Sequence, residues 1–159
     1  MIVHVLKSGF FSAFAHNHEI EAAIELGDVN ESGGLSAQLR VDARKLHVLD
    51  PEASADTRVK IQETMLGPQV LDADRFPEID FKSTAVEPKG RGRWLVRGDL
   101  DLHGQTHPVT VDVTLQDDVY RGTAVVKQTE FGIKPVSIAG GTVNVKDEVK
   151  IEFEIVLVK

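Results

Sequence analysis

Apolar and polar side chains alternate along most of this 159-residue chain, and this alternation restricts its fold more than any other feature. Residues 14–26 are a clear example. Successive side chains of a β-strand point to opposite faces, so a run with period 2 indicates a strand buried on one face only. The polar face of this run carries Asn17, Glu19, Glu21 and Glu25. The apolar face also holds two histidines, and its members are His16, His18, Ile20, Ala22, Ile24 and Leu26.

Seven further runs have strand character, and turn residues separate many of them at the spacing of hairpins. One intervening segment differs. Ser54 or Asp56 offers a helix N-cap there, an apolar stripe of helical period follows, and Gly67 ends it. We therefore predict an all-β fold, an antiparallel barrel or sandwich with one short helical insertion at about residues 54–75. The eight predicted strands cover residues 2–6, 14–26, 35–43, 78–83, 94–102, 109–115, 119–126 and 149–157.

The interior of such a fold can be used in two ways. The length suits a single domain covering residues 1–159. An eight-stranded barrel is wide enough either to be filled by its own side chains or to hold one small ligand. Small residues on the predicted inner face favour a cavity, although tapered packing of a filled core would need the same mixture. These small residues are Ala22, Ala37, Ala43, Gly98 and Gly122.

Composition excludes several classes of function. The net charge is −7, and residues 89–93 form the only basic cluster, which argues against a nucleic-acid partner. The chain has no cysteine, so it can form neither a disulfide nor a thiolate metal site. No stretch approaches the roughly 20 apolar residues of a membrane-spanning helix. Residues 1–7 lack the features of a signal peptide, so we expect a cytoplasmic protein as the chain is written, or a periplasmic one if a leader was trimmed.

Three aromatic residues lie close together near the start of the chain. Phe10, Phe11 and Phe14 would occupy both faces of a strand, so at least one would point outward unless a bulge intervenes. An outward aromatic side chain there suggests contact with the helical segment or with a second copy of the chain. A homodimer is therefore compatible with the sequence.

Four local patterns, in this order, resemble the successive signatures of the YceI-like family of bacterial proteins. The patterns are FSAFAHNH at 11–18, DADRFPEIDFKS at 72–83, GDLDLHGQTHPV at 98–109 and EFGI at 130–133. The resemblance implies an eight-stranded, lipocalin-like antiparallel barrel with a helical segment beside it. It also implies a long apolar cavity that takes a polyisoprenoid chain, such as an isoprenoid quinone or a prenyl phosphate. The chain departs from the family pattern at its start, where the Asp-x-x-His-Ser type of opening is missing.

The resemblance and the alternation together predict carriage or storage of a lipophilic ligand inside the barrel, without catalysis and without a cofactor. His16 and His18 would either contact its polar head or be structural residues near the barrel mouth, hydrogen-bonded to backbone or water. The remaining residues would line the cavity. The predicted ligand-binding residues are His16, His18, Ile20, Ile24, Phe81, Trp94, Val96, Leu100, Leu102, Phe131 and Phe153.

Two other functions remain open at this point. The barrel could have a filled core and act as a structural or stress-related interaction protein. A metal site on His16 and His18 is less favoured. It would need a third ligand, and the spacing of the other histidines does not identify one of them as that ligand. A catalytic role has little support, because no Gly-x-Ser-x-Gly elbow is present and the His103 and His107 pair spans a turn instead of a helix.

Overall fold

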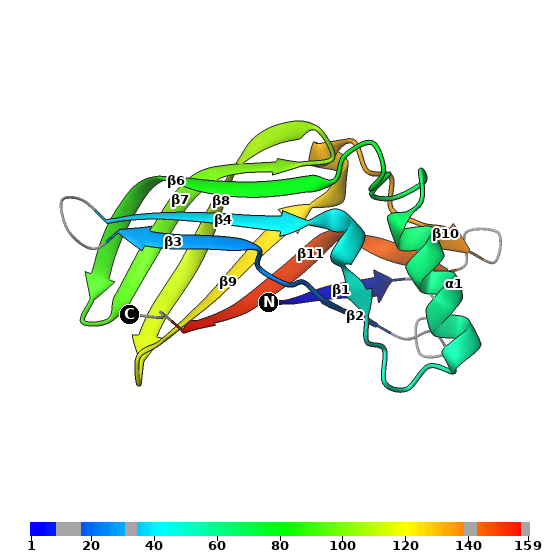
Figure 1. Ribbon diagram of the computed structural model, residues 1–159, viewed down its shortest axis with the longest axis horizontal. Helices are drawn as coiled ribbons and strands as arrows, with labels where there is room; N and C mark the ends of the chain where they lie inside the picture. Colours follow the sequence, from blue (N-terminus) through cyan, green and yellow to red (C-terminus); the bar gives the residue numbers. More distant parts are fainter. Residues whose placement is uncertain (9–16, 31–34, 139–142, 157–159) are drawn as a thin grey trace.

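The computed structural model describes residues 1–8, 17–30, 35–138 and 143–156. These residues form a mostly β fold, a strongly curled antiparallel sheet with the shape of a half-barrel and one short α-helix at one end (Figure 1). Along the sheet the strands are β3 (Leu26–Asn30), β4 (Ser36–Asp42), β6 (Glu78–Gly90), β7 (Arg93–Leu102), β8 (Gln105–Gln116), β9 (Val119–Lys127), β11 (Val143–Val156), β1 (Ile2–Ser8), β2 (His18–Glu21) and β5 (His47–Val48), and β10 (Ser137–Ile138) pairs with β11.

We predicted a barrel of eight strands, and the structure instead has a curled sheet that is open in its described strand order, with β3 at one end and β5 at the other. The predicted strand 14–26 is in fact divided between two partners. The amide of Ala22 donates to the carbonyl of Met1 at 2.9 Å, whereas the amide of Glu25 donates to the carbonyl of Arg40 at 2.9 Å. Its first half thus belongs to β2 beside β1, and its end belongs to β3 beside β4. The backbone of residues 22–25, which belong to no strand, joins the two sides of the sheet.

The inward face changes phase where the chain crosses from β2 to β3. Ile20 and Ala22 are buried and Ile24 faces the interior, as the alternation predicts. Leu26, predicted to face inward, is 50% exposed, and Val29 lines the interior instead. The step from Ile24 to Val29 is odd, so the period-2 pattern is interrupted at the point where the pairing partner changes.

The helical insertion forms where the sequence places it, but it is shorter. Helix α1 (Ala55–Leu66) begins at the N-cap Ser54, whose Oγ accepts the amide hydrogen of Thr57 at 3.2 Å, and it ends at Gly67. Turns continue the segment to residue 75. Two 3₁₀ helices, η2 (Ala43–Lys45) and η3 (Gln128–Phe131), are additional helical turns that the alternation did not predict.

Helix α1 lies at one end of the sheet (Figure 1). Two adjoining apolar clusters pack at this end. The first joins β2, β4 and β5 to Met65 of α1, and the second surrounds Phe131 of η3. Val3, Leu71 and Ile79 pack against both clusters, so the two are continuous. Within the described ranges no helix is long and apolar enough to cross a membrane.

Candidate ligand-binding cavity

The concave side of the sheet encloses a cavity of about 440 Å³. Its wall is almost entirely aliphatic and aromatic, and the polar residues among those lining it are Ser36, Tyr120 and Gln128. A cavity of this volume lies in the usual range for sites that take one small molecule, a few hundred to about 1,000 Å³. The interior is therefore not filled by its own side chains, which answers the question that the sequence left open.

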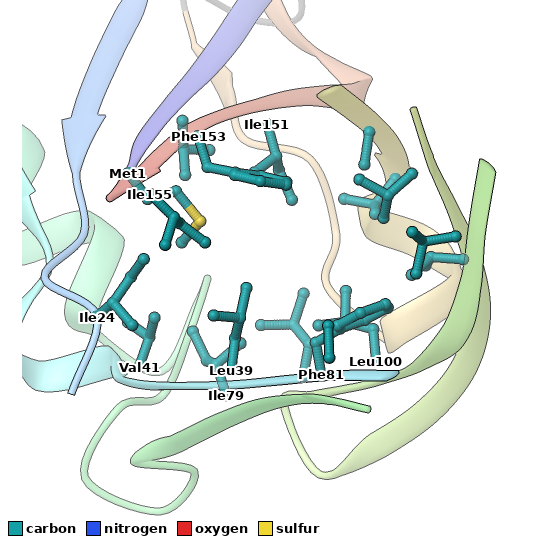
Figure 2. A pocket seen from close by; sticks show the side chains of 18 of the residues that line it. Met1, Ile24, Leu39, Val41, Ile79, Phe81, Leu100, Ile151, Phe153 and Ile155 are labelled. Atoms are coloured by element: carbon teal, nitrogen blue, oxygen red, sulfur yellow. The ribbon is translucent and has the colours of Figure 1, made fainter. Parts of the chain in front are cut away.

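Cross-strand pairing builds the wall in rows, because paired residues of an antiparallel sheet point to the same face. In one row Trp94 of β7 is paired with Val113 of β8, Val113 with Gly122 of β9, and Gly122 with Phe153 of β11. All four strands thus contribute to one band of the inner surface. Figure 2 shows the side chains converging on a common space, with Phe153 and Ile151 on one side and Leu39, Ile79, Phe81 and Leu100 on the other.

The cavity extends away from α1, toward the ends of the hairpins. Leu115 is paired with Tyr120, only one pair before the β8–β9 turn at residues 117–118, and both line the cavity. Leu35, which directly precedes β4, lines it as well and is 42% exposed. The apolar surface therefore continues to the rim of the sheet at this end, whereas the apolar clusters beneath α1 close the other end.

Most of the residues predicted to bind a ligand lie in this wall. The alternation identified them because β7 and β11 keep their period-2 pattern across the cavity, whereas in β6 a register shift between Ser83 and Ala85 moves the inward face to Val86. The predicted residues that line the cavity are Ile20, Ile24, Phe81, Trp94, Val96, Leu100, Leu102 and Phe153.

Phe131 lies outside the wall. It belongs to η3 and not to a strand, its exposed fraction is 0%, and it packs in the cluster beside the cavity. The ring of His107 stands edge-on to it, with 5.2 Å between ring centroids, and Nδ1 of His103 lies 3.1 Å from its carbonyl oxygen. Phe131 therefore supports the closed end of the cavity instead of facing a ligand.

His18 makes a polar contact that the sequence did not suggest, and it is not among the residues lining the cavity. Its Nδ1 lies 2.7 Å from Oδ2 of Asp50, a residue that is 2% exposed. The other oxygen of this carboxylate accepts the amide hydrogen of Glu19 at 2.8 Å. His18 and Asp50 thus fasten β2 to the loop before α1. His16 lies outside the described residues.

His4 also makes a contact between strands. Nε2 of His4 lies 2.9 Å from Oε2 of Glu152 on the strand pair β1–β11. The hydrogen bond from Lys150, with a smaller contribution from His4, lowers the pKa of Glu152. In the part of the chain that the structure describes, no three His, Asp or Glu side chains are grouped so that they could hold a metal ion. The described residues thus form an apolar container.

Fold and cavity together define a class of protein, an antiparallel β half-barrel with an apolar interior. The family model described as the YceI-like domain matches residues 4–157. The chain belongs to the YceI family, as the four sequence patterns indicated.

Relatives with known sequences match only part of the chain. A UPF0312 protein of Vibrio cholerae is 35% identical over 74 residues, which are 40% of this chain and 39% of the relative. A UPF0312 protein of Pseudomonas savastanoi is 27% identical over 109 residues, 62% of this chain and 54% of the relative. The match therefore spans about two fifths to a half of these relatives.

Solved structures resemble the chain over nearly its full length. BcnA of Burkholderia cenocepacia has a TM-score of 0.61 at 21% identity, over 96% of this chain and 94% of that one. The YCEI protein of Campylobacter jejuni has a TM-score of 0.58 at 12% identity, over 94% of this chain and 81% of that one. At these identities the likeness concerns the fold.

Proposed function

We propose that this protein binds one lipophilic molecule, with a tail of polyisoprenoid type, in the cavity and carries or stores it without transforming it. The observation that supports the proposal best is the chemistry of the wall, in which Ser36, Tyr120 and Gln128 are the polar members of an otherwise apolar lining. The family resemblance implies the same type of ligand.

Burial of the tail supplies the binding energy. Transfer of each methylene group from water to apolar surroundings is worth about 0.8 kcal/mol, and such a tail has many of them. An apolar wall discriminates weakly between tails by chemistry, so shape and length decide which one fits. The curled sheet would in this way act as a lipocalin-like container.

The polar head of a quinone or a prenyl phosphate would remain at the open rim. No charged side chain is among the residues described as lining the cavity, and a buried unpaired phosphate would cost far more than the tail gains from its first few methylene groups. The rim, where Tyr120 and Leu35 lie, is accessible to water and can leave the head solvated. The tail would therefore enter first and point toward α1.

Binding without chemistry is proposed because the wall supplies no activated group. No histidine, lysine, aspartate or glutamate is among the described residues that line the cavity. General acid–base or nucleophilic catalysis needs such a partner within hydrogen-bond reach.

Trp94 makes this proposal directly testable. It is the single tryptophan of the chain, it lines the cavity, and its ring centroid lies 6.0 Å from that of Tyr120. Titration with geranylgeraniol should change the fluorescence of Trp94 in a saturable manner, with one molecule bound per chain. Native mass spectrometry of the same sample should show the corresponding added mass.

Two substitutions on neighbouring residues of β9 provide the matched control. Ala124 lines the cavity, whereas Thr123 is exposed on the outer face of the sheet. Ala124→Phe should fill the cavity and weaken binding by roughly tenfold or more, and Thr123→Phe should leave it unchanged. Equal binding by both variants, or no response of the unaltered protein to any apolar tail, would disprove the proposal.

A further inference from the structure

Gly122 and Phe153 are directly paired across β9 and β11, and the phenylalanine ring lies over the glycine. A Cβ atom added at Gly122 would overlap Cζ, Cε1 and Cε2 of this ring. All three of its nearest atoms belong to Phe153, so the ring occupies the space that a side chain at position 122 would need. The glycine therefore allows the ring to lie flat against the sheet.

A ring also lies over a glycine on β6 and β7, although here the two residues are diagonal neighbours, because Gly98 is paired with Ser83 and Phe81 with Leu100. A Cβ atom added at Gly98 would lie 2.5 Å from Cε2 and from Cζ of Phe81. It would also lie 2.5 Å from the carbonyl oxygen of Lys82. The ring of Phe81 is thus held close to the sheet in the same manner, although here the backbone is crowded too.

The two rings lie on opposite walls of the cavity. Both Phe81 and Phe153 line it, and three strands separate β6 from β11 in the strand order. Figure 2 shows Phe153 and Phe81 on facing sides of the open space. The distance between these walls, and hence the room for a tail, depends on how closely each ring follows its strand.

We propose that Phe81 and Phe153 determine the cross-section of the tail that the cavity accepts, and that Gly98 and Gly122 are positioning residues that hold the two rings flat. This inference rests on the proposed function, because it concerns the selectivity of the same cavity. Aromatic rings are rigid and nearly planar, so a ring over glycine adds apolar surface to the wall at the smallest loss of width.

Gly122 is the better position for a test, because only side-chain atoms crowd it. Gly122→Ala should push the ring of Phe153 into the cavity and weaken geranylgeraniol binding about tenfold. Gly122→Ala combined with Phe153→Leu removes the ring and should restore binding to within about threefold of the unaltered protein. Thr123→Ala is a suitable control, since Thr123 is the next residue of β9, is exposed and does not line the cavity.

Removal of the Phe153 ring alone should widen the cavity and shift its selectivity toward wider lipids. Phe153→Ala should raise the affinity for a wider, fused-ring lipid such as cholesterol relative to geranylgeraniol, by about tenfold. An unchanged ratio of the two affinities, or failure of the double variant to regain binding while it remains folded, would overturn the inference.

The position of the ring can also be measured without any ligand. In the unaltered protein, NMR should show nuclear Overhauser contacts between the Phe153 ring protons and the Gly122 α protons, together with a ring-current shift of the latter. Gly122→Ala should remove the close ring-to-backbone contact. If no tail binds but these contacts are present, the proposed function fails while the ring geometry stands. If tails bind but the contacts are absent, the inference alone fails.

Discussion

Nδ1 of His18 lies 2.7 Å from the buried carboxylate of Asp50, which joins strand β2 to the loop that leads into α1. The same carboxylate accepts the amide hydrogen of Glu19 at 2.8 Å. This contact connects two segments 32 residues apart at the closed end of the container. The contact is structural. It involves His18, one of the two histidines on the apolar face of residues 14–26.

Removal of this carboxylate should destabilise the fold. Asp50→Ala leaves the partly buried His18 ring and Glu19 amide without their acceptor, which should cost about 1–3 kcal/mol of unfolding free energy in urea. Asp99→Ala, on the exposed face of β7, should change stability by less than about 0.5 kcal/mol. Equal effects of the two substitutions would show that the contact is not stabilising.

The packing of α1 is centred on Met65, with Ile61 and Leu66 packed against the same cluster. Met65 is its buried residue and belongs to the apolar cluster with Ile20 and Val48. Met65→Ala should lower the free energy of unfolding by about 2–5 kcal/mol, through lost contacts and the space left behind. Val59 lies on the same helix but is 55% exposed, so Val59→Ala should have an effect within about 0.5 kcal/mol. A small loss for Met65→Ala would mean that α1 is only loosely attached.

Asp42 should titrate at an unusually low pH. Nε and Nη2 of Arg44 donate to its two oxygens at 2.9 Å and 2.7 Å, and these hydrogen bonds are the main reason why the pKa of Asp42 falls from 3.8 to about 2. Because the pKa is lower in the folded state, the contribution of Asp42 to stability is complete above 3.8 and is lost as the pH falls through about 2.

The carboxyl ¹³C resonance of Asp42 measures this pKa directly. In the unaltered protein its midpoint should lie near 2, and in Arg44→Gln it should move up toward 3.8. The acid side of the stability curve should move in the same direction. A midpoint that remains near 2 in the variant would mean that the backbone amide of residue 44, and not the Arg44 side chain, lowers the pKa of Asp42.

The hairpin between β7 and β8 requires glycine at its second turn position. Gly104 has a φ of +69°, and an added Cβ would lie 2.6 Å from Cε1 of Phe76. Gly104→Ala should therefore cost about 1–2 kcal/mol for the left-handed backbone alone and more for the contact with the ring. In a Phe76→Leu background the cost of the ring contact should disappear. Thermal unfolding of the unaltered protein, the two single variants and the double variant can measure this. Additive effects would show that the ring contact contributes nothing.

The sequence predicted the inner wall of the cavity well, because alternation is a local property. Trp94, Val96, Leu100 and Leu102 could be placed from β7 alone, since an unbroken strand keeps its faces. The helix was likewise predictable from its N-cap Ser54 and from the glycine at its end.

The errors concern residues whose environment depends on distant partners. Leu26 is exposed because the chain changes partner from β1 to β4 just before it, and nothing local marks that change. Phe131 has strand-like neighbours in sequence but forms a 3₁₀ turn that packs beside the cavity. Asp50 was visible as the residue before Pro51, a loop signal, and its pairing with His18 could come only from the folded chain.

The crossing at residues 22–25 has a mechanical consequence. Strand β2 ends at Glu21 and strand β3 begins at Leu26, so the two sides of the sheet are connected there by covalent backbone and not by a continuous hydrogen-bonded ladder. If the two sides of the sheet move apart here, the backbone dihedral angles of residues 22–25 change, and the paired strands stay paired. By contrast, the strands from β4 to β11 are each hydrogen-bonded to the next in the sheet.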